Sequence, residues 1–369
     1  MNILFLISTL GLGGAEKQLL YWIRILQSDF DASSSVAYFS PSQSARLLTL
    51  EELEVPVIAV GRESHALRRV SKVVSFARRN RAEIIHAFNC YLSPVAVVAG
   101  AAVRAVPVSS FRGDGLSDLQ ALGGLLRRPT LKLVRNYTSN SRWALDQVKP
   151  FVRGDSLLQY VPNLVTLPRL PRRPKPHTES GRTVALAVGR LDCNKRLEVF
   201  LEALAIARSE EPGLTGVIVG EGPDRTALER RACQLGLLPD GVTFRGEVTD
   251  PAQNYASADV FVHLAESEGT PNVVLEAMSM ELPVVTTPAG DLRFMVEPRQ
   301  TGFLVPTNDP KTTAQRLIQL SRSSRLRAEL GARGRKYVED SHNIDAVRNS
   351  LDRFYAALRR PHESLRPRR

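Results

Sequence analysis

The sequence predicts an α/β protein of two domains, each a doubly wound parallel sheet covered by helices on both faces. Its 369 residues exceed what one ordinary hydrophobic core accommodates, which favours two domains. Short apolar runs alternate with helical segments along both halves of the chain, a pattern typical of parallel sheets. A proline-rich, charged stretch at 162–182 separates the halves, because its prolines cannot donate to a sheet and its charges cannot form a core.

Five apolar runs in the first half predict strands, with helical segments between them. These runs are ILFLIS at 3–8, SSVAYFS at 34–40, VPVIAV at 55–60, AEIIHAF at 82–88 and VPVSSF at 106–111. The segment AEKQLLYWIRIL at 15–26 has the apolar spacing of a helix. The apolar stretch LSPVAVVAGAAV at 92–103 contains a proline and stops at an arginine, so we expect a buried helix there.

Six apolar runs in the second half predict strands in the same way. These runs are TVALAVG at 183–189, TGVIVG at 215–220, VTFRG at 242–246, DVFVHLA at 259–265, PVVTT at 283–287 and GFLVP at 302–306. Helices are expected at 224–236 and 311–322. A last helical stripe is expected to pack on a domain surface, and it consists of Val347, Leu351, Phe354, Tyr355 and Leu358. The tail after Arg359 is expected to be disordered.

The pattern predicts four segments along the chain. We expect an N-terminal domain over 1–165, a proline-rich linker over 166–182, a C-terminal domain over 183–340, and a C-terminal helix with a basic tail over 341–369. Two doubly wound domains joined by a linker imply a central cleft, with ligands at the carboxyl ends of the strands.

Composition narrows the class of protein. No apolar run reaches the roughly 20 residues of a membrane-spanning helix, and the N-terminus has no basic leader typical of a signal peptide. The three cysteines lie far apart, which predicts neither a disulfide framework nor a zinc site and favours a cytoplasmic setting. The net charge of +11 indicates an anionic partner, but no nucleic-acid-binding motif is visible and only 6% of residues are aromatic, so we expect no nucleic acid.

Glycines follow the first predicted strand and open a helix, where backbone N–H groups and the helix dipole attract phosphate. Gly11, Gly13 and Gly14 occupy this turn. Their spacing is not the G-x-G-x-x-G of a dinucleotide site, and no acidic residue ends the next strand to hold a ribose. A tight turn that needs glycine for its conformation alone explains the loop equally well.

Two cations follow the first strand of the second domain. Arg190 and Lys195 in VGRLDCNKR could clamp a diphosphate, because arginine suits bidentate contact and lysine supplies a point charge. A solvated charged loop is the alternative. The next strand ends in GEGP at 220–223, a second turn that permits close backbone approach at the same sheet edge.

The stretch AESEGTPNVVLEAM at 265–278 places two carboxylates around the start of a helix. Pro271 suits the first helical position with Thr270 as its N-cap. Glu268 then precedes the helix and Glu276 lies in its second turn. These carboxylates could accept hydrogen bonds from sugar hydroxyls beside a helix end that accepts phosphate, or they could be one loop acid and one surface acid.

Taken together, these residues resemble the retaining, GT-B-fold glycosyltransferases of the group 1 (family 4) type. The resemblance rests on G-G-A-E at 13–16, G-R-L-x-x-x-K at 189–195, G-x-G-P at 220–223 and E-G-x-P-x-x-x-x-E-A-M at 268–278, and it covers nearly the whole chain. It implies the GT-B fold, in which two doubly wound, Rossmann-like domains face a central cleft. The acceptor would bind to the first domain and the nucleotide sugar to the second.

The resemblance also implies residue roles. Arg190 and Lys195 would bind the donor diphosphate, helped by the amides of Gly13 and Gly14. Glu268 would contact the donor sugar and Glu276 the nucleotide ribose. The backbone around Gly269, Thr270 and Asn272 would lie against the sugar and phosphates, and the FRGEV segment at 244–248 would lie near the base. Such enzymes need no metal and no cofactor besides a donor of the UDP or GDP type, because cations and helix dipoles stabilise the leaving diphosphate.

The chain departs from the family at one position. Many members carry a histidine after the fourth strand of the first domain, where this chain reads VSSFRGDG with Arg112 and Asp114. His86, at the end of AEIIHAF, is a second candidate to touch substrate and carry a catalytic role. A lone histidine at a strand end is more often structural.

Two basic segments in the first domain predict contact with an anionic membrane. RRVSKVVSFARRNR at 68–81 and LGGLLRRPTLKLVRN at 122–136 mix apolar residues with cations, each of which adds about 1 kcal/mol of attraction near such a surface. A crossover helix with a solvated face is the alternative for the first segment. We expect a peripheral protein on the inner membrane face with a lipid-linked acceptor.

The sequence therefore predicts a retaining, metal-independent hexosyltransferase that moves sugar from a nucleoside-diphosphate sugar to a glycan acceptor, in the biosynthesis of a polysaccharide or glycolipid. A sugar-nucleotide epimerase or a phosphorylase would share the two-domain frame. A non-catalytic protein that binds sugar nucleotides is a further alternative, because the family histidine is missing. A NAD-dependent dehydrogenase is disfavoured by the glycine spacing.

Overall fold

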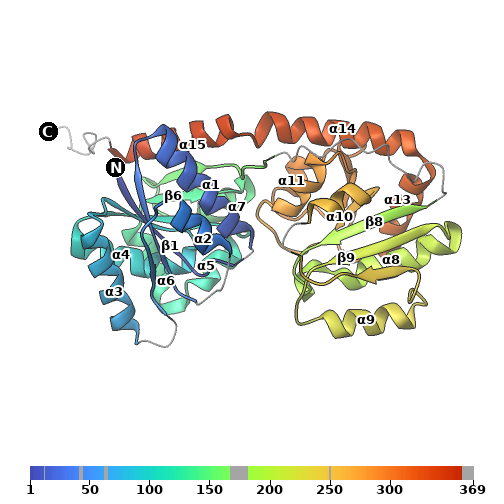
Figure 1. Ribbon diagram of the computed structural model, residues 1–369, viewed down its shortest axis with the longest axis horizontal. Coiled ribbons are helices and arrows are strands. Elements are labelled where there is room, and N and C mark those ends of the chain that lie inside the picture. Colours follow the sequence, from blue (N-terminus) through green and yellow to red (C-terminus); the bar gives the residue numbers. More distant parts are fainter. Residues whose placement is uncertain (12, 41–44, 62–64, 167–181, 249–250, 360–369) are drawn as a thin grey trace. The chain divides into compact units, whose positions relative to one another are not determined.

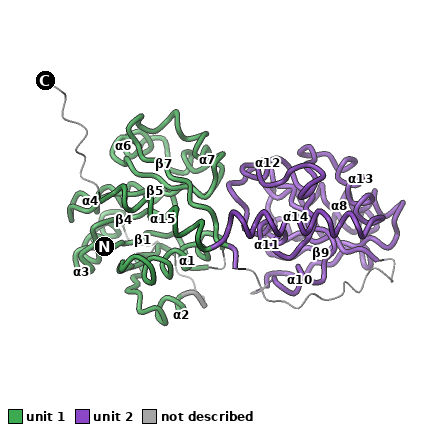
Figure 2. Tube along the Cα trace, turned by 90° about the horizontal axis from the view of Figure 1, so that it is seen from above, with its two compact units in different colours: residues 1–164, 344–369 green, residues 165–343 purple. Residues whose placement is uncertain are grey.

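The computed structural model describes residues 1–11, 13–40, 45–61, 65–166, 182–248 and 251–359 (Figure 1). The chain divides into two compact units (Figure 2). Unit 1 contains Met1–Leu164 together with the chain from Ile344 onward, and unit 2 contains Val165–Asn343. The division therefore falls at Leu164 and Val165, just before the expected linker. Most of that linker, 167–181, and the tail from 360 lie outside the described residues.

Unit 1 is a seven-stranded parallel sheet in the order β3-β2-β1-β4-β5-β6-β7. Its strands are β1 (Asn2–Ile7), β2 (Ser33–Tyr38), β3 (Val57–Ala59), β4 (Ile84–Ala87), β5 (Val106–Phe111), β6 (Asn136–Ser139) and β7 (Leu157–Tyr160). Its helices are α1 (Gly14–Asp29), α2 (Ala45–Glu52), α3 (Ala66–Arg79), α4 (Ser93–Val103), α5 (Leu116–Ala121), α6 (Gly124–Leu133), α7 (Arg142–Val148) and α15 (Ile344–Arg359). All five expected strands are confirmed, and β6 and β7 extend the sheet beyond them.

Alternation along β1 builds the two cores of unit 1. Ile3 and Phe5 pack with α1 and α15 on one face, while Leu4 and Leu6 pack with α3 and α4 on the other. Side chains alternate between the two faces of a strand, so this apolar run supplies both cores. The stripe of α15 packs in the first of them, where Leu358 is partly buried and its other four residues are buried. The final helix is therefore not a separate segment after 340, because it completes the core of unit 1.

Unit 2 is a six-stranded parallel sheet in the order β10-β9-β8-β11-β12-β13. Its strands are β8 (Thr183–Val188), β9 (Leu214–Val219), β10 (Val242–Phe244), β11 (Val260–His263), β12 (Val284–Thr286) and β13 (Gly302–Leu304). Its helices are α8 (Leu197–Glu210), α9 (Arg225–Gln234), α10 (Ala252–Ser257), α11 (Asn272–Ser279), α12 (Leu292–Met295), α13 (Pro310–Arg322) and α14 (Ser324–Ser341). All six expected strands are confirmed.

Helices cover both faces of the second sheet as well. Residues of α8, α9 and α13 pack on one face, and residues of α10, α11, α12 and α14 pack on the other. The predicted class of two doubly wound α/β domains is therefore confirmed. The strand order reverses between β1 and β4 in unit 1 and between β8 and β11 in unit 2. In open α/β sheets ligands bind beyond the carboxyl ends of the strands at such a point, which directs attention to the loops after β8 and β11.

We predict that truncating the fully buried Leu351 of α15 to alanine destabilises unit 1 by about 2–5 kcal/mol, because it leaves a cavity in a core that this helix completes. Urea unfolding followed by tryptophan fluorescence reports on this unit, since both tryptophans, Trp22 and Trp143, lie in it. The control is Asp352→Ala, at an exposed position of the same helix. Equal unfolding midpoints for the two variants would contradict the assignment of α15 to unit 1.

Candidate functional site

Loops of unit 2 approach each other backbone to backbone at the carboxyl ends of the strands. The loop after β9 passes so close to the loop after β8 that a Cβ at Gly220 would overlap the carbonyl group of Gly189. Gly290, at φ +51°, approaches the carbonyl oxygen of Glu268 in the same way. Glycine is required at both positions, because any side chain would separate the loops. These contacts bring the GRL, GEGP and EGTP segments to one edge of the sheet.

A buried ionic cluster lies at this edge. Lys195, in the short helical turn Cys193–Lys195, donates through Nζ to Glu268 Oε1. His263, at the end of β11, lies with Nε2 3.1 Å from the same carboxylate oxygen. The side chains of Lys195 and Glu268 are 21% and 15% exposed, so water screens their attraction only weakly.

The partners of Glu268 fix its protonation state. Burial alone would raise the pKa of Glu268, but the hydrogen bond from His263 and the positive charge of Lys195 outweigh it and hold that pKa at about 2. Burial lowers the pKa of His263, so its imidazole is neutral at pH 7 and Nε2 donates its proton to the carboxylate. Glu268 is therefore an ionised acceptor of hydrogen bonds rather than an acid.

Two residues of this cluster were not anticipated from the sequence. His263 holds Glu268, and its only signal in the sequence is a polar residue at the end of an apolar strand. Asn194 joins the two loops, because its side chain donates to the carbonyl of Ser267 at 3.0 Å and accepts from the N–H of Ser267 at 3.0 Å. Nothing in the spacing of the sequence distinguishes this asparagine from an ordinary loop residue.

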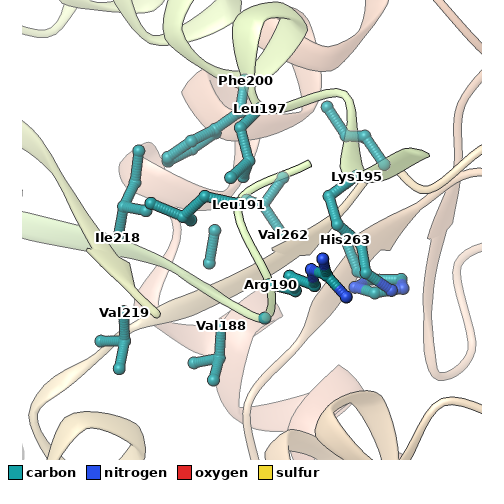
Figure 3. A pocket seen from close by; sticks show the side chains of 13 residues that line it. Val188, Arg190, Leu191, Lys195, Leu197, Phe200, Ile218, Val219, Val262 and His263 are labelled. Carbon is teal, nitrogen blue, oxygen red and sulfur yellow. The ribbon is translucent and has the colours of Figure 1, made fainter. Parts of the chain in front are cut away.

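Arg190 is the exposed cation of the site. Its side chain is 73% exposed, with Nε 3.6 Å from the carboxylate of Asp192. Figure 3 shows Arg190, Lys195 and His263 gathered at one end of a pocket whose other walls are apolar side chains of β8, β9, β11 and α8. The exposed arginine and the partly buried lysine give this edge of the sheet a positive charge that suits an anionic ligand.

The start of α11 differs in detail from the prediction. The helix begins at Asn272 with Pro271 as its N-cap residue, and no side chain caps it. Thr270 is therefore not the N-cap, because its Oγ1 donates instead to Asp291 Oδ2 at 3.0 Å. This bond, together with the bond from the N–H of Asp291 to the carbonyl of Gly269 at 3.0 Å, ties the EGTP loop to the loop after β12.

The predicted placement of the two carboxylates is confirmed. Glu268 precedes α11 and Glu276 lies in its second turn. Glu276 is partly exposed, and its Oε2 accepts a hydrogen bond from the hydroxyl of Tyr255 at 3.0 Å. This contact of Glu276 differs from those of Glu268, which bonds to Lys195 and His263.

The glycines of the first turn belong to unit 1. Gly13 precedes α1 and Gly14 is its first residue, and both are exposed. No side chain caps this helix start. A Cβ at Gly13 would overlap the carboxylate of Glu16, whose Oε1 accepts from Thr9 Oγ1 at 3.2 Å. Gly13 has an ordinary φ of −61°, and a Cβ there would meet only the flexible end of the Glu16 side chain, so neither conformation nor packing requires glycine at this position.

His86 does not reach a surface where substrate could touch it. Its side chain is 0% exposed in the core of unit 1, with Nδ1 3.1 Å from the hydroxyl of Tyr355 and Nε2 2.8 Å from Ser110 Oγ. Burial lowers the pKa of His86 well below its ordinary value, so the ring is neutral. The catalytic interpretation of His86 is corrected accordingly: it is a satisfied core histidine.

Known protein families and structures resemble this chain. Residues 182–323 match the family model of glycosyl transferases group 1. The capsular polysaccharide biosynthesis glycosyltransferase CapM of Staphylococcus aureus is 27% identical over 168 residues, which is 46% of this chain and 44% of that protein. A GDP-mannose-dependent alpha-mannosyltransferase of Mycolicibacterium smegmatis is 40% identical over 127 residues, which is 34% of this chain and 31% of that protein. The chain spans about half the length of the first curated relatives it matches.

Solved structures share the architecture over almost the whole chain. Anabaena HepE, in complex with UDP and glucose, superposes with a TM-score of 0.82 at 20% identity, covering 96% of this chain and 99% of that one. Sucrose-phosphate synthase from Thermosynechococcus elongatus gives a TM-score of 0.75 at 19% identity, covering 97% and 98%. At such identities the likeness establishes the fold.

We predict that Glu268→Gln removes an acid-sensitive part of the stability of unit 2. The folded pKa of about 2 lies below the ordinary glutamate pKa of 4.5, so the ionised carboxylate stabilises the fold above pH 4.5, and this contribution is lost as pH falls toward 2. The ionised carboxylate contributes about 3 kcal/mol to the free energy of unfolding. Urea unfolding followed by circular dichroism checks this between pH 6 and pH 3. The free energy of unfolding should fall less steeply with acid for Glu268→Gln than for the wild type.

The control for this experiment is Glu329→Gln, an exposed glutamate of α14 that pairs with Arg325 in solvent. This variant should decline with acid much as the wild type does, because exposed pairs contribute little. Parallel acid curves for the wild type and Glu268→Gln would contradict the assignment of the buried charge.

Proposed function

We propose that the chain is a glycosyltransferase that moves a sugar from a nucleoside-diphosphate sugar to a glycan acceptor. The match of residues 182–323 to glycosyl transferases group 1 and the shared fold support this proposal. The observation that carries this proposal is the ionised Glu268, held by Lys195 and His263 at the carboxyl edge of the unit 2 sheet. Such a carboxylate suits a ligand rich in hydroxyl groups, and the adjacent cations suit a diphosphate.

Each residue of the site has a role in this proposal. Lys195 and Arg190 bind the diphosphate of the donor. Glu268 accepts hydrogen bonds from hydroxyls of the donor sugar, and Glu276, on the first turns of α11, accepts them from the ribose. The backbone N–H groups at the start of α11, including those near Gly269, Thr270 and Asn272, face phosphate, because the N-terminal end of a helix carries partial positive charge. Unit 1 takes the acceptor.

The reaction would be transfer of a hexose with retention of configuration. The bond between the anomeric carbon and the phosphate oxygen breaks, a bond from the acceptor oxygen to that carbon forms on the same face, and the acceptor proton passes to the departing phosphate. Negative charge then grows on the diphosphate, where Lys195 and Arg190 stabilise it. We propose that these cations act without a metal ion or other cofactor, and that the donor base is uracil or guanine.

We predict that a nucleoside diphosphate or its sugar conjugate raises the melting temperature of the wild type and that Lys195→Ala and Glu276→Ala abolish this rise, because ligand stabilises the folded state by mass action. A thermal-shift panel of UDP, GDP, ADP and their sugars checks it. Lys336→Ala is the matched control, since this lysine is 73% exposed on α14 and pairs only with Asp340 in the described part of the chain. If no nucleoside diphosphate shifts any of these proteins, the proposal fails.

Turnover distinguishes the alternative enzymes of the same fold. A transferase consumes donor rapidly only when acceptor is present, apart from slow hydrolysis. An epimerase converts donor alone, a phosphorylase uses inorganic phosphate, and a binding protein shows the thermal shift without product. Product analysis with and without a glycan acceptor therefore separates all four.

We further propose that unit 1 attaches peripherally to the inner face of an anionic membrane and takes a lipid-linked acceptor there, in the biosynthesis of a polysaccharide or glycolipid. The exposed leucines and arginines of α3 and α6, two helices that both pack against α4, support this proposal. On α6, Leu125 and Leu126 are 94% and 54% exposed beside Arg127 and Arg128, and on α3, Leu67 is 85% exposed next to two arginines. No helix in the described ranges is long and apolar enough to cross a membrane.

We predict that the protein floats with vesicles containing anionic lipid at low salt and not with zwitterionic vesicles, because cations and exposed leucines act together at such a surface. Replacing Leu125 and Leu126 by glutamine should reduce flotation severalfold. Leu48→Gln is the control, since Leu48 is also an exposed leucine of unit 1 but lies on α2. Equal flotation of all variants, or none of the wild type, would count against membrane attachment.

A further inference from the structure

Unit 1 contains a cation that the proposed donor site does not use. Arg112 follows β5, so it lies at the carboxyl edge of the unit 1 sheet. Its guanidinium carbon lies 3.8 Å from the ring centroid of Phe88 and 4.8 Å from that of Trp22. Both rings are fully buried, and they hold the guanidinium group by cation–π contact.

Two nitrogens of the Arg112 side chain have no hydrogen-bond partner among the described residues. These nitrogens, Nε and Nη2, are both buried. Nε1 of Trp22, in the ring beside the guanidinium, is likewise buried and unpartnered. All three of these atoms are donors. Buried donors are normally satisfied, so a group of them without an acceptor indicates that the acceptor comes from outside the chain.

The two unused nitrogens form one edge of the guanidinium group. The N–H bonds of Nε and Nη2 point in parallel along that edge, which matches the two oxygens of a carboxylate or phosphate and gives a bidentate contact. An ordinary solvent-facing arginine would satisfy these donors with water. Arg112 is partly exposed as a residue, while the two nitrogens of this edge are buried.

Arg112 forms no ion pair within the part of the chain that the structure describes. Asp118, on α5, acts on Arg112 through its charge, which raises the pKa of the guanidinium, but its Oδ2 accepts a hydrogen bond from the N–H of Gly113 at 2.8 Å. His86 and Tyr355 also lie close by, and both are neutral at pH 7. Burial lowers the pKa of Arg112 only to about 9, so the guanidinium stays charged at neutral pH.

We propose that Arg112 is an oxyanion-binding residue of unit 1, whose Nε–Nη2 edge takes two oxygens of an acidic group on the acceptor. The assignment of this ligand to the acceptor rests on the proposed function, whereas the binding of an oxyanion does not. A carboxylate of an acidic sugar and a phosphate of a lipid-linked acceptor share this chemistry. In this proposal the acceptor carries an anionic group, and the contact of Arg112 with that group determines which acceptors unit 1 binds.

Trp22 provides a direct probe of this site. In a Trp143→Phe background it is the remaining tryptophan of the chain, and its ring contacts the guanidinium. Adding Lys195→Ala to that background removes a principal phosphate contact of the donor site. Inorganic phosphate and glucuronate are then titrated separately while Trp22 fluorescence is followed. A saturable change with phosphate indicates a phosphorylated acceptor, and a change with glucuronate indicates an acidic sugar.

Variants of Arg112 make the test decisive. R112M should abolish the fluorescence response, and R112K should weaken binding by roughly tenfold, because lysine retains the charge and loses the bidentate edge. In buffer without oxyanions R112M should melt at or above the wild-type temperature, because it removes an unpartnered buried cation and keeps the side-chain length. R316M is the matched control, since Arg316 also stacks on a ring, Phe303, in unit 2.

Two results would overturn the proposal. One is a Trp22 response to neither anion, and the other is a response that persists in R112M. A loss of melting temperature in R112M in oxyanion-free buffer would identify Arg112 as a structural cation and would count against it as well. Failure of nucleotides to bind at Lys195 and Glu276 leaves these readouts unchanged, so the donor-site proposal and the Arg112 proposal fail separately.

Discussion

Close backbone packing among the loops of unit 2 is the constraint on which its site depends. Gly220 lies against Gly189, and Gly290 lies against Glu268, with no room for a side chain at either glycine. The two contacts hold four loops from neighbouring strand ends at one sheet edge. Asn194 adds a reciprocal side-chain link between two of them. Lys195 and Glu268, which are 73 positions apart in the chain, are therefore brought into contact by the packing of the backbone.

The electrostatics of the site follow from this packing. Removing a carboxylate from water is unfavourable unless cations and donors replace the lost hydration. Lys195 and His263 do so for Glu268, which stays ionised while largely buried. The result is a preorganised negative group beside a positive edge formed by Lys195 and Arg190. A ligand with hydroxyls next to a diphosphate complements both charges, whereas a ligand with only one of these features complements half of the site.

His86 and Arg112, two polar residues of unit 1, differ in whether their buried nitrogens have hydrogen-bond partners. His86 is neutral and both of its ring nitrogens have partners, so burial costs little and the residue belongs to the core. Arg112 is charged, packs against two aromatic rings and leaves one donor edge unused. The difference between a satisfied and an unsatisfied buried group separates a structural role from a ligand-binding role, and residue type alone does not reveal it.

The sequence by itself determined the two-sheet architecture, the strands of unit 2 and the positions of Glu268 and Glu276 relative to α11, because these depend on local apolar periodicity and on short turn motifs. Tertiary structure decided the rest. The weakly apolar β6 and β7, the return of α15 to unit 1, the bond of Thr270 to Asp291 and the contacts of His263, Asn194 and Arg112 all join residues distant in the chain. Side chains at strand ends look alike in a sequence, and only packing decides which are buried, paired or left with an unused donor.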